Sequence, residues 1–486
     1  MNNKSTAHKM ASNSLWNAVE NFSQLGIQMI CTFILARFLT PSDFGLMGML
    51  VIFTQIAKTI TESGFGTALI RAKVVTQQDY SSIFYLNLIL GVVLYFILFC
   101  CSPFIADFYH QPIFNAMCKV TFLVIPVFAL QVVQRAIMVR KLQFKKQGLL
   151  SIAAALLSSF VAILLAYKWR NVWALVVQNL LMGVLTTLFY WIFAKWHPSW
   201  TFSTISIKKY LSFSKNLLLT GLVGSFFNNI NALLIGRFYT SADLGFYNQA
   251  NRINLIASGQ TTNIIKNVSY PILSQVNNNG GNLKQGYKKV IVITVLFVGC
   301  IMVILMGIAQ DLLEILMGGE EWRRSGQYLM ILGFAGMLHP LHSINENILR
   351  VVGDSKSLLR LELIRRCIML VILAITVHFN VIVFVFGYVI YSFVLLFLNM
   401  SVCGKPIHYS LREQISDISP ILCRQLFLIF IAISLNYILS DYNIFIRIFV
   451  VFSISTFICF LLFKNNEAFK IVIQLLKEMI LKRIEK

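Results

Sequence analysis

Charged and amide side chains occur within stretches of this sequence that are otherwise strongly apolar. An isolated charge inside a membrane is costly, so we expect these residues to face a polar cavity or to pair with one another. Side chains of these types hold ligands through ion pairs and hydrogen bonds. The cationic and amide candidates are Arg252, Asn228, Asn229, Asn231, Lys58, Arg71, Arg135, Lys266 and Arg350, and the acidic candidates are Glu20, Glu62 and Glu346.

Spacing gives some of these charges a partner on their own helix. Lys58 and Glu62 are four residues apart on one expected helix face, and Glu346 and Arg350 share that spacing. Such pairs can satisfy each other without a ligand. Arg252 differs, because no acidic residue lies within two turns of it along the chain. Pairing and ligand binding therefore both stay open for the two pairs, whereas Arg252 has no such local partner.

The sequence shows no catalytic or metal-binding constellation. A Gly-rich phosphate loop followed by Lys and Ser or Thr, a zinc-ligand spacing and a Ser/His/Asp set are all missing. All nine cysteines lie inside or at the edge of apolar stretches, without metal-ligand spacing. His339 and His342 flank Pro340, which indicates a kinked helix with core histidines or a proton relay. We therefore expect no cofactor, no metal and no enzymatic activity.

The elements that must position these residues are membrane-spanning helices. Apolar residues make up 57% of the 486 and charged residues only 12%, against roughly 25% charged residues in soluble domains. A bilayer core requires about 20 mostly apolar residues per helix. The sequence therefore predicts an all-α polytopic membrane protein of about 14 helices, with twelve as the alternative, because the spans that begin near 15, 43, 211 and 243 are rather polar. The expected spans are 15–38, 43–62, 82–107, 114–137, 148–167, 172–194, 211–237, 243–266, 289–309, 326–349, 358–377, 380–401, 419–439 and 444–463.

The basic residues predict the orientation. Most of the 41 Lys and Arg fall in alternate connections, and positive connections stay in the cytoplasm. This pattern predicts that both termini are cytoplasmic, and it accounts for most of the net charge of +22 without a nucleic acid partner. The polar start of the chain lacks a signal-peptide core, so we expect the first span to direct insertion. Residues 464–486 have the pattern of a basic amphipathic helix, expected to lie on the inner leaflet or to contact a partner.

An internal repeat divides the chain. Residues 34–46 read ILARFLTPSDFGL and residues 234–246 read LIGRFYTSADLGF, and each copy joins the first two spans of its half at the expected outer face. The sequence therefore predicts two parallel six-helix bundles, and transporters built in this way bind substrate between the bundles. The expected division is an N-terminal bundle (1–195), a cytoplasmic linker (196–210), a C-terminal bundle (211–403), two extra helices (404–463) and the tail (464–486).

The repeated motif has a local explanation that competes with a functional one. Thr40 is a good N-cap, Pro41 suits the first helical position and Asp43 completes a capping box. Thr240 and Asp243 repeat the box in the second copy. We expect the capping role, with direct contact to a substrate as the alternative.

These residues also resemble a known family. The strings LARFLTPSDFGLMGM, ESGFGTALIR and FSKNLLLTGLVGSFFNNINALLIGRFYTSADLGFYNQANRI are similar to the polysaccharide-transporter branch of the multidrug/oligosaccharidyl-lipid/polysaccharide (MOP) exporter superfamily. That branch holds the Wzx-type repeat-unit flippases of O-antigen, capsule, exopolysaccharide and teichuronic acid pathways. The resemblance covers roughly residues 10–463 and implies a MATE/MOP-like fold of two bundles.

The resemblance implies a function. Such proteins flip undecaprenyl-diphosphate-linked oligosaccharides to the outer leaflet of the bacterial inner membrane, next to membrane lipids and in cooperation with a polymerase and a chain-length regulator. A cavity lined by cationic and amide groups would shelter the charged head. Arg252 and the amides at 228–231 are the preferred diphosphate or sugar contacts, with interhelical bonding as the alternative for the amides. Arg71 and Arg135 would meet the diphosphate or anionic lipid headgroups near the inner side, and Glu20, Glu62 and Glu346 could couple transport to H⁺ or Na⁺.

Two other functions remain open. A multidrug or peptidoglycan-precursor exporter of the same superfamily would share the architecture. A membrane polysaccharide polymerase or ligase would need room for a site outside the membrane, and the expected outer connections are short. The flippase is therefore the leading hypothesis.

Overall fold

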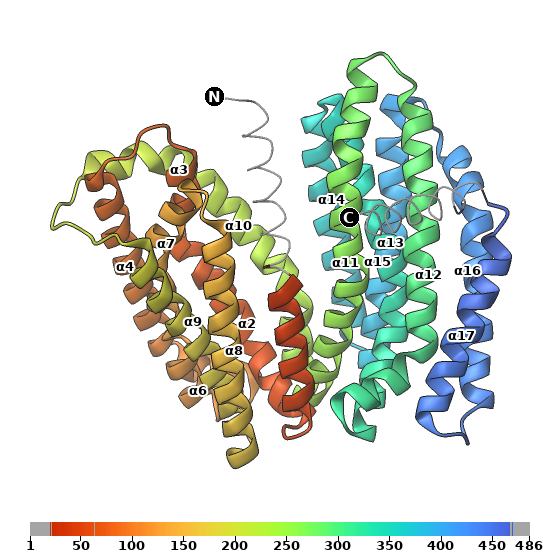
Figure 1. Cartoon of the computed structure of the whole chain (residues 1–486), viewed down its shortest axis with the longest axis horizontal. Helices are drawn as coiled ribbons and strands as arrows, with labels where there is room; N and C mark the ends of the chain where they lie inside the picture. Colours follow the sequence, from red (N-terminus) through yellow and green to blue (C-terminus); the bar gives the residue numbers. More distant parts are fainter. Residues whose placement is uncertain (1–19, 21, 63, 467–468, 470–486) are drawn as a thin grey trace, which may run out of the picture. The chain divides into compact units, whose positions relative to one another are not determined.

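A computed structural model describes residue 20 and residues 22–62, 64–466 and 469 (Figure 1). Within these residues the chain forms α-helices and two short 3₁₀ turns, with no strand. The predicted all-α class is therefore confirmed. Nearly all of the predicted tail, 464–486, lies outside the described residues. The chain divides into two compact units, Met1–Gly245 and Phe246–Lys486.

The first unit contains the helices up to the middle of the chain. Residues 22–36 are helical and precede nine labelled helices. These are α2 (Pro41–Glu62), α3 (Phe65–Arg71), α4 (Gln77–Cys100), α5 (Ser102–Tyr109), α6 (Phe114–Thr121), α7 (Val124–Arg140), α8 (Phe144–Trp169), α9 (Trp173–Ala194) and α10 (Thr204–Phe238).

The second unit contains most of the next helix and all that follow it. Its longest helices extend beyond the thickness of a bilayer core, because 35 residues at 1.5 Å each span about 50 Å. The elements are α11 (Ser241–Asn278), α12 (Leu283–Met317), η1 (Glu320–Trp322), α13 (Arg323–Val352), α14 (Ser355–Thr376), α15 (Val381–Cys403), η2 (Lys405–Ile407), α16 (Leu411–Ile438) and α17 (Ile444–Phe463).

Ten helical segments of the described residues are long and apolar enough to cross a membrane. The expected spans that begin near 43 and 211 are among them, although both were expected to be rather polar. Residues 22–36 form an apolar helix that is too short to be counted. The long helices α11, α13 and α14 are not among the ten, and they carry many of the polar groups discussed below. The count of fourteen spans stays a prediction.

Each copy of the repeated motif forms a capping box. Thr40 N donates to Asp43 Oδ2 at 2.9 Å, and Asp43 N donates to Thr40 Oγ1 at 3.4 Å. Thr240 and Asp243 make the same two bonds at 3.3 and 3.1 Å. These bonds satisfy backbone N–H groups that have no partner inside the helix. The capping role predicted from the sequence is confirmed.

The two copies of the motif also contact each other within the first unit. Ser42 Oγ lies 2.6 Å from Ser241 Oγ. A Cβ atom on Gly45 would lie 1.7 Å from the carbonyl oxygen of Ser241, and one on Gly245 would lie 1.9 Å from that of Pro41. Only glycine permits such an approach of two backbones. This reciprocal contact explains why both copies have glycine at the same place.

The core of the first unit forms around α7. This helix packs against α2, α3, α4 and α9, while α8 packs against α9. The helix α10 also packs against α2, α3 and α4. Fully buried side chains such as Phe114, Phe122 and Ile83 fill the interior. The predicted bundle boundaries near 195 and 211 stay a prediction.

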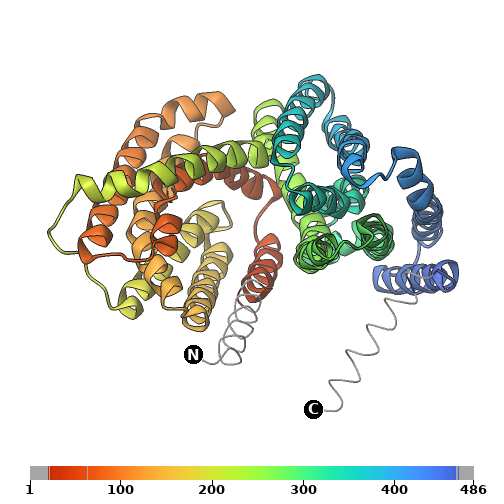
Figure 2. The same cartoon turned by 90° about the horizontal axis from the view of Figure 1, so that it is seen from above.

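The core of the second unit forms around α12. This helix packs against α13, α16 and α17, and α13 packs against α15. The helices α16 and α17 form one edge of this unit (Figures 1 and 2). A Cβ atom on Gly307 would lie 2.7 Å from the Cβ of Ala432, so the glycine lets α16 approach α12 closely.

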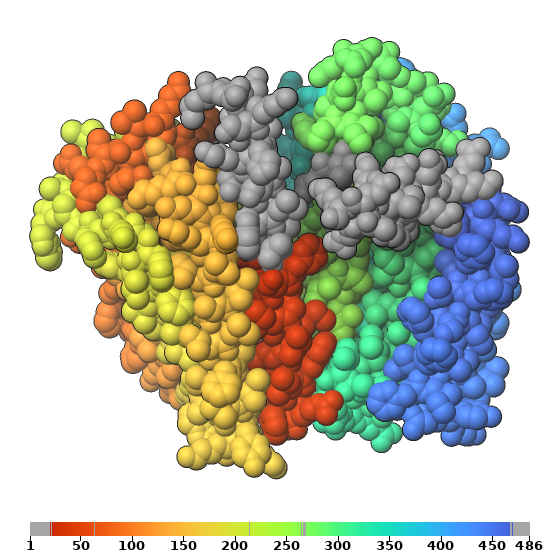
Figure 3. Space-filling view, viewed as in Figure 1, coloured from red at the N-terminus to blue at the C-terminus, as the bar shows by residue number. Residues whose placement is uncertain are grey.

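Apolar side chains point outward from the helices at this edge. On α17, Phe445, Phe449 and Phe457 are 66%, 71% and 62% exposed. This helix lies at the surface of its unit, as the blue atoms in Figure 3 show. In water such a face would be unfavourable, whereas lipid tails can cover it. The exposed aromatic rings therefore support a location in the membrane.

Candidate functional site

Acidic and basic candidates of the first unit lie together where α2 approaches α7. Arg135 Nη1 lies 4.0 Å from Glu62 Oε1, and both side chains are about half exposed, at 54% and 43%. Lys58 Nζ lies over the ring of Phe128, 4.6 Å from its centroid. The structure therefore pairs Glu62 with Arg135 on another helix. The expected partner Lys58 instead makes a cation–π contact.

Glu20 lies in a polar group close to this pair. Its side chain is 9% exposed and contacts α8, where a Cβ atom on Gly148 would lie 3.1 Å from the Glu20 Cβ. Ser151 hydrogen-bonds the Glu20 carboxylate, and Ser151 Oγ lies 3.2 Å from the Tyr190 hydroxyl. Glu20 is therefore a buried carboxylate that lies against α8.

The amide candidates lie along α10. Asn229 Nδ2 donates to the carbonyl oxygen of Ser225 one turn earlier, at 2.8 Å. Ser225 Oγ lies 2.8 Å from Thr59 Oγ1 on α2. Asn231 is buried and Asn228 is exposed. Asn229 is thus engaged within its own helix, and the contact between α10 and α2 runs through the hydroxyls of Ser225 and Thr59.

Three cationic candidates have different surroundings. Arg71 is exposed in the last turn of α3. Arg252 is half-buried on α11, in the second unit. Lys266 also lies on α11, but its side chain is outside the described part of the chain. A joint site of Arg252 with the amides of α10 stays a prediction.

A dense polar network joins α13, α14 and α15 in the second unit. Arg350 Nη2 lies 3.3 Å from Glu346 Oε2, which is the pair that the spacing suggested. Glu346 also accepts from Arg365 Nη1 at 2.5 Å, and the same nitrogen lies 3.4 Å from Glu362. Arg365 Nη2 donates to Asn399 Oδ1 at 2.7 Å. The Arg365 side chain is only 7% exposed, so this interior cation is held by three partners.

The network continues to a histidine. Because Asn399 Oδ1 accepts from Arg365, its Nδ2 donates to His342 Nδ1 at 3.1 Å. The other ring nitrogen, His342 Nε2, lies 3.1 Å from Ser392 Oγ and donates to it. This pattern fixes a neutral ring with the proton on Nε2. His342 therefore takes part in a structural chain of hydrogen bonds next to Pro340, which lies inside α13.

A second buried ion pair holds α17 against α12. Arg447 Nε donates to Asp311 Oδ2 at 2.6 Å, and Asn436 Nδ2 donates to the same oxygen at 2.9 Å. Asp311 is 0% and Arg447 6% exposed. Arg323 adds a further ion pair to Asp311 at 3.6 Å. These residues were not among the sequence candidates, although a lone arginine in the apolar span 444–463 is a signal that could have identified them.

Arg365 was not among the sequence candidates either, although it lies close to Arg360 and Arg366 along the chain. The structure buries it in the interior, where its carboxylate partners come from its own helix and from α13. Its spacing of three residues from Glu362 was a signal of that role. The second unit thus uses this arginine for packing, whereas the pair of Glu62 and Arg135 in the first unit is about half exposed.

Comparisons with known proteins agree with this architecture. The sequence profile of the family described as "Polysaccharide biosynthesis protein" matches residues 34–327. The teichuronic acid biosynthesis protein TuaB of Bacillus subtilis is 24% identical over 351 residues, which are 72% of this chain and 72% of that protein. Lipid II flippase MurJ in an inward closed conformation has a TM-score of 0.73 at 12% identity, over 93% of this chain and 99% of that one. An inward-facing MATE family multidrug resistance transporter of the MOP superfamily has a TM-score of 0.61 at 16% identity, over 79% of this chain and 94% of that one. The predicted MATE/MOP-like fold is confirmed.

Proposed function

The chain belongs to the polysaccharide biosynthesis protein family, and we propose that it flips an undecaprenyl-diphosphate-linked oligosaccharide across the bacterial inner membrane. The oligosaccharide would then be used for O-antigen, capsule or exopolysaccharide assembly. Family membership, the relative in teichuronic acid biosynthesis and the MATE/MOP-like fold support the proposal. The chain would be a transporter without a chemical step of its own, with both termini in the cytoplasm.

The observation that carries this proposal is the accessible charge of the first unit. Glu62 and Arg135 form a long ion pair whose two side chains are about half exposed. Lys58 is held beside them by an aromatic ring and has no carboxylate partner among the residues that the structure describes. A diphosphate needs cations that can exchange partners, because strongly satisfied buried pairs would have to be broken first. Arg135 and Lys58 meet that need.

The remaining candidates have roles in the same proposal. Arg71 would meet the diphosphate as it approaches, and Arg252, Lys266 and Arg350 would line its path. The amides Asn228, Asn229 and Asn231 would contact sugar hydroxyls. Glu20, Glu62 or Glu346 would carry H⁺ or Na⁺ in exchange, and a polymerase with a chain-length regulator would use the flipped product.

The test is deletion of the gene followed by analysis of lipid-linked intermediates. We expect undecaprenyl-linked repeat units to accumulate on the inner leaflet and surface polysaccharide to be lost. Wild-type protein should restore both, and Arg135→Ala should not, at equal protein level. Lys146→Ala is the matched control, because Lys146 is exposed at the start of the neighbouring helix α8. Absence of accumulation would exclude this function.

A peptidoglycan-precursor exporter is the second candidate, and the likeness of fold to a lipid II flippase is the observation that favours it. The same deletion separates the two hypotheses. Loss of a lipid II exporter would make peptidoglycan precursors accumulate and would stop growth. Loss of a polysaccharide flippase would leave peptidoglycan synthesis intact.

A further inference from the structure

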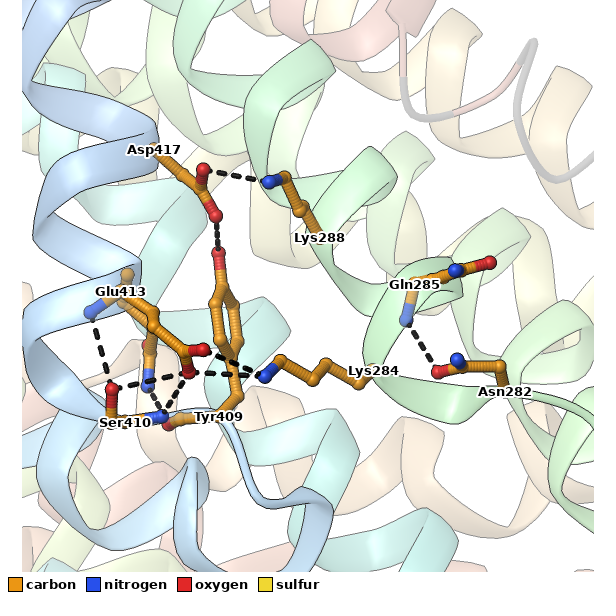
Figure 4. A network of polar contacts seen from close by, with 9 residues as sticks. Asn282, Lys284, Gln285, Lys288, Tyr409, Ser410, Glu413 and Asp417 are labelled. Atoms are coloured by element: carbon orange, nitrogen blue, oxygen red, sulfur yellow. Dashed lines mark hydrogen bonds and ion pairs between the residues drawn. The ribbon is translucent and has the colours of Figure 1, made fainter.

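A polar pocket lies where α12 and α16 begin. Its volume is about 660 Å³, within the usual range of roughly 300–1,000 Å³ for ligand sites. One side is formed by the first turns of α12, including Lys284 and Lys288, and the other by the first turns of α16, including Arg412 and Glu413. Figure 4 shows side chains from both helices pointing toward one another across it. The basic pattern of the sequence predicts that this end of the unit faces the cytoplasm.

Two ion pairs cross the pocket. Lys284 Nζ lies 3.0 Å from both carboxylate oxygens of Glu413, and Lys288 Nζ lies 2.7 Å from Asp417 Oδ1 (Figure 4). The hydroxyl of Tyr409 donates to the second oxygen of Asp417 at 2.5 Å. Lys284 is 35% and Lys288 49% exposed, so water reaches both ammonium groups. Each ammonium has three N–H donors, so Lys288 keeps donors for a ligand.

The pocket has more positive than negative charge. Its lining holds three cations, Lys284, Lys288 and Arg412, against two carboxylates. Arg412 is exposed, and among the residues that the structure describes it has no ion-pair partner. Two long helices also begin here, and each helix N-terminus adds roughly half a positive charge. The side chains alone leave an excess of one positive charge, which suits an anionic group such as phosphate.

A purely structural role explains less of this arrangement. Half-exposed ion pairs contribute about 0–1 kcal/mol each, so the two pairs would fasten α16 to α12 only weakly. Such a fastening would need neither an open volume nor a third cation. Glu413 accepts from Lys284 and also completes the capping box of α16 with Ser410, so this carboxylate has a structural role. The open volume and the Arg412 guanidinium are not needed for that role and are available to a ligand.

We propose that this pocket is a phosphate-binding site, occupied by the phosphate of a lipid headgroup at the membrane surface or by a soluble phosphate compound. Arg412 would bind two phosphate oxygens through its planar guanidinium, and Lys288 would donate to a third. Lys284 would keep its ion pair with Glu413, which joins the two sides of the pocket. The site does not depend on the proposed transport function, because none of its residues belongs to the charged groups assigned to transport.

Binding to the purified full-length protein in phosphatidylcholine nanodiscs tests the proposal. One arm titrates inorganic phosphate and pyrophosphate by calorimetry at low salt. In the other arm the nanodiscs contain about 20% phosphatidylglycerol, an anionic lipid, and native mass spectrometry measures how many lipid molecules stay bound to the protein. Binding in the first arm identifies a soluble ligand, and retention only in the second identifies a lipid headgroup.

Variants decide whether the pocket is responsible. Arg412→Ala should weaken binding at least tenfold, since a charged, hydrogen-bonded contact is lost. Arg412→Lys should recover part of it, which also shows that the helix is folded. Arg424→Ala is the matched control, because Arg424 lies on the same helix but bonds to the carbonyl oxygen of Leu462. No binding in either arm, or equal binding by Arg412→Ala and Arg424→Ala, would overturn the proposal.

Discussion

One ion pair in the first unit and two charged groups in the second differ in how far their side chains are exposed. In the first unit the ion pair of Glu62 and Arg135 is long, at 4.0 Å, and both side chains are about half exposed. In the second unit Arg365 and Asp311 are 7% and 0% exposed, and each has several partners. Burial of a paired charge stabilises only if every partner stays in place. The two buried groups of the second unit therefore fix helices, whereas the half-exposed pair of Glu62 and Arg135 in the first unit stays available to a ligand.

The largest expected effect on stability comes from breaking the buried ion pair of Asp311 and Arg447. Asp311→Ala leaves the Arg447 guanidinium buried without a carboxylate, which costs about 3–5 kcal/mol. We expect a large fall in the thermal unfolding midpoint of the purified protein and the release of α17 from α12. Asp441→Ala is the control, because Asp441 is exposed and accepts a hydrogen bond from the neighbouring Ser440 hydroxyl. Equal unfolding midpoints for the two variants would contradict a structural role for this pair.

A smaller effect is expected at Arg365. Arg365→Met removes the shared partner of Glu346, Glu362 and Asn399. The loss should be about 2–3 kcal/mol, less than at Asp311, because Glu346 keeps Arg350 and is 21% exposed. Arg360→Met, at an exposed position of the same helix, should change the unfolding midpoint little. A drop in transport at an unchanged midpoint would instead place Arg365 in the substrate path.

In the first unit, loss of the Arg135 side chain should reduce transport strongly and stability only slightly. Arg135→Ala should change the free energy of unfolding by less than about 1 kcal/mol, because its ion pair is half exposed. Flipping of lipid-linked oligosaccharide should nevertheless fall at least tenfold, since the cation that exchanges between carboxylate and diphosphate is gone. Lys146→Ala should leave both quantities unchanged. If Arg135→Ala lost stability as Arg365→Met does, the contrast between the units would be wrong.

Contacts between residues that lie close together along the chain were predictable from the sequence. The capping boxes of Thr40 and Thr240 depend on residues three positions apart, and the pair of Glu346 and Arg350 on residues four apart. Spacing indicated these contacts, although Lys58 and Glu62 share the second spacing and do not pair. The all-helical class followed from composition in the same way. Contacts of this kind need no knowledge of how one helix packs against another.

Partners on different helices were not predictable. Glu62 pairs with Arg135 and Glu346 with Arg365 because the rotation of each helix about its axis brings those faces together. A single sequence does not fix that rotation, and a nearby alternative partner existed in both cases. The pocket at the start of α12 and α16 was missed for the same reason, since its two walls are more than a hundred residues apart in the sequence.

The smallest effect concerns a charge outside both networks, at the start of α14. Asp354 caps this helix, accepting from Ser357 N at 3.0 Å, and hydrogen bonds from the Ser357 side chain and backbone lower the pKa of the Asp354 carboxyl. A lowered pKa in the folded state means that the carboxylate stabilises the fold above about pH 3.9 and stops doing so as the pH falls through the folded-state pKa. The thermal unfolding midpoint of the wild type should therefore decrease more steeply below about pH 4 than that of Asp354→Asn, which keeps a capping oxygen without a titrating group. Identical pH profiles would mean that ionisation of this cap contributes nothing to the acid sensitivity of the fold.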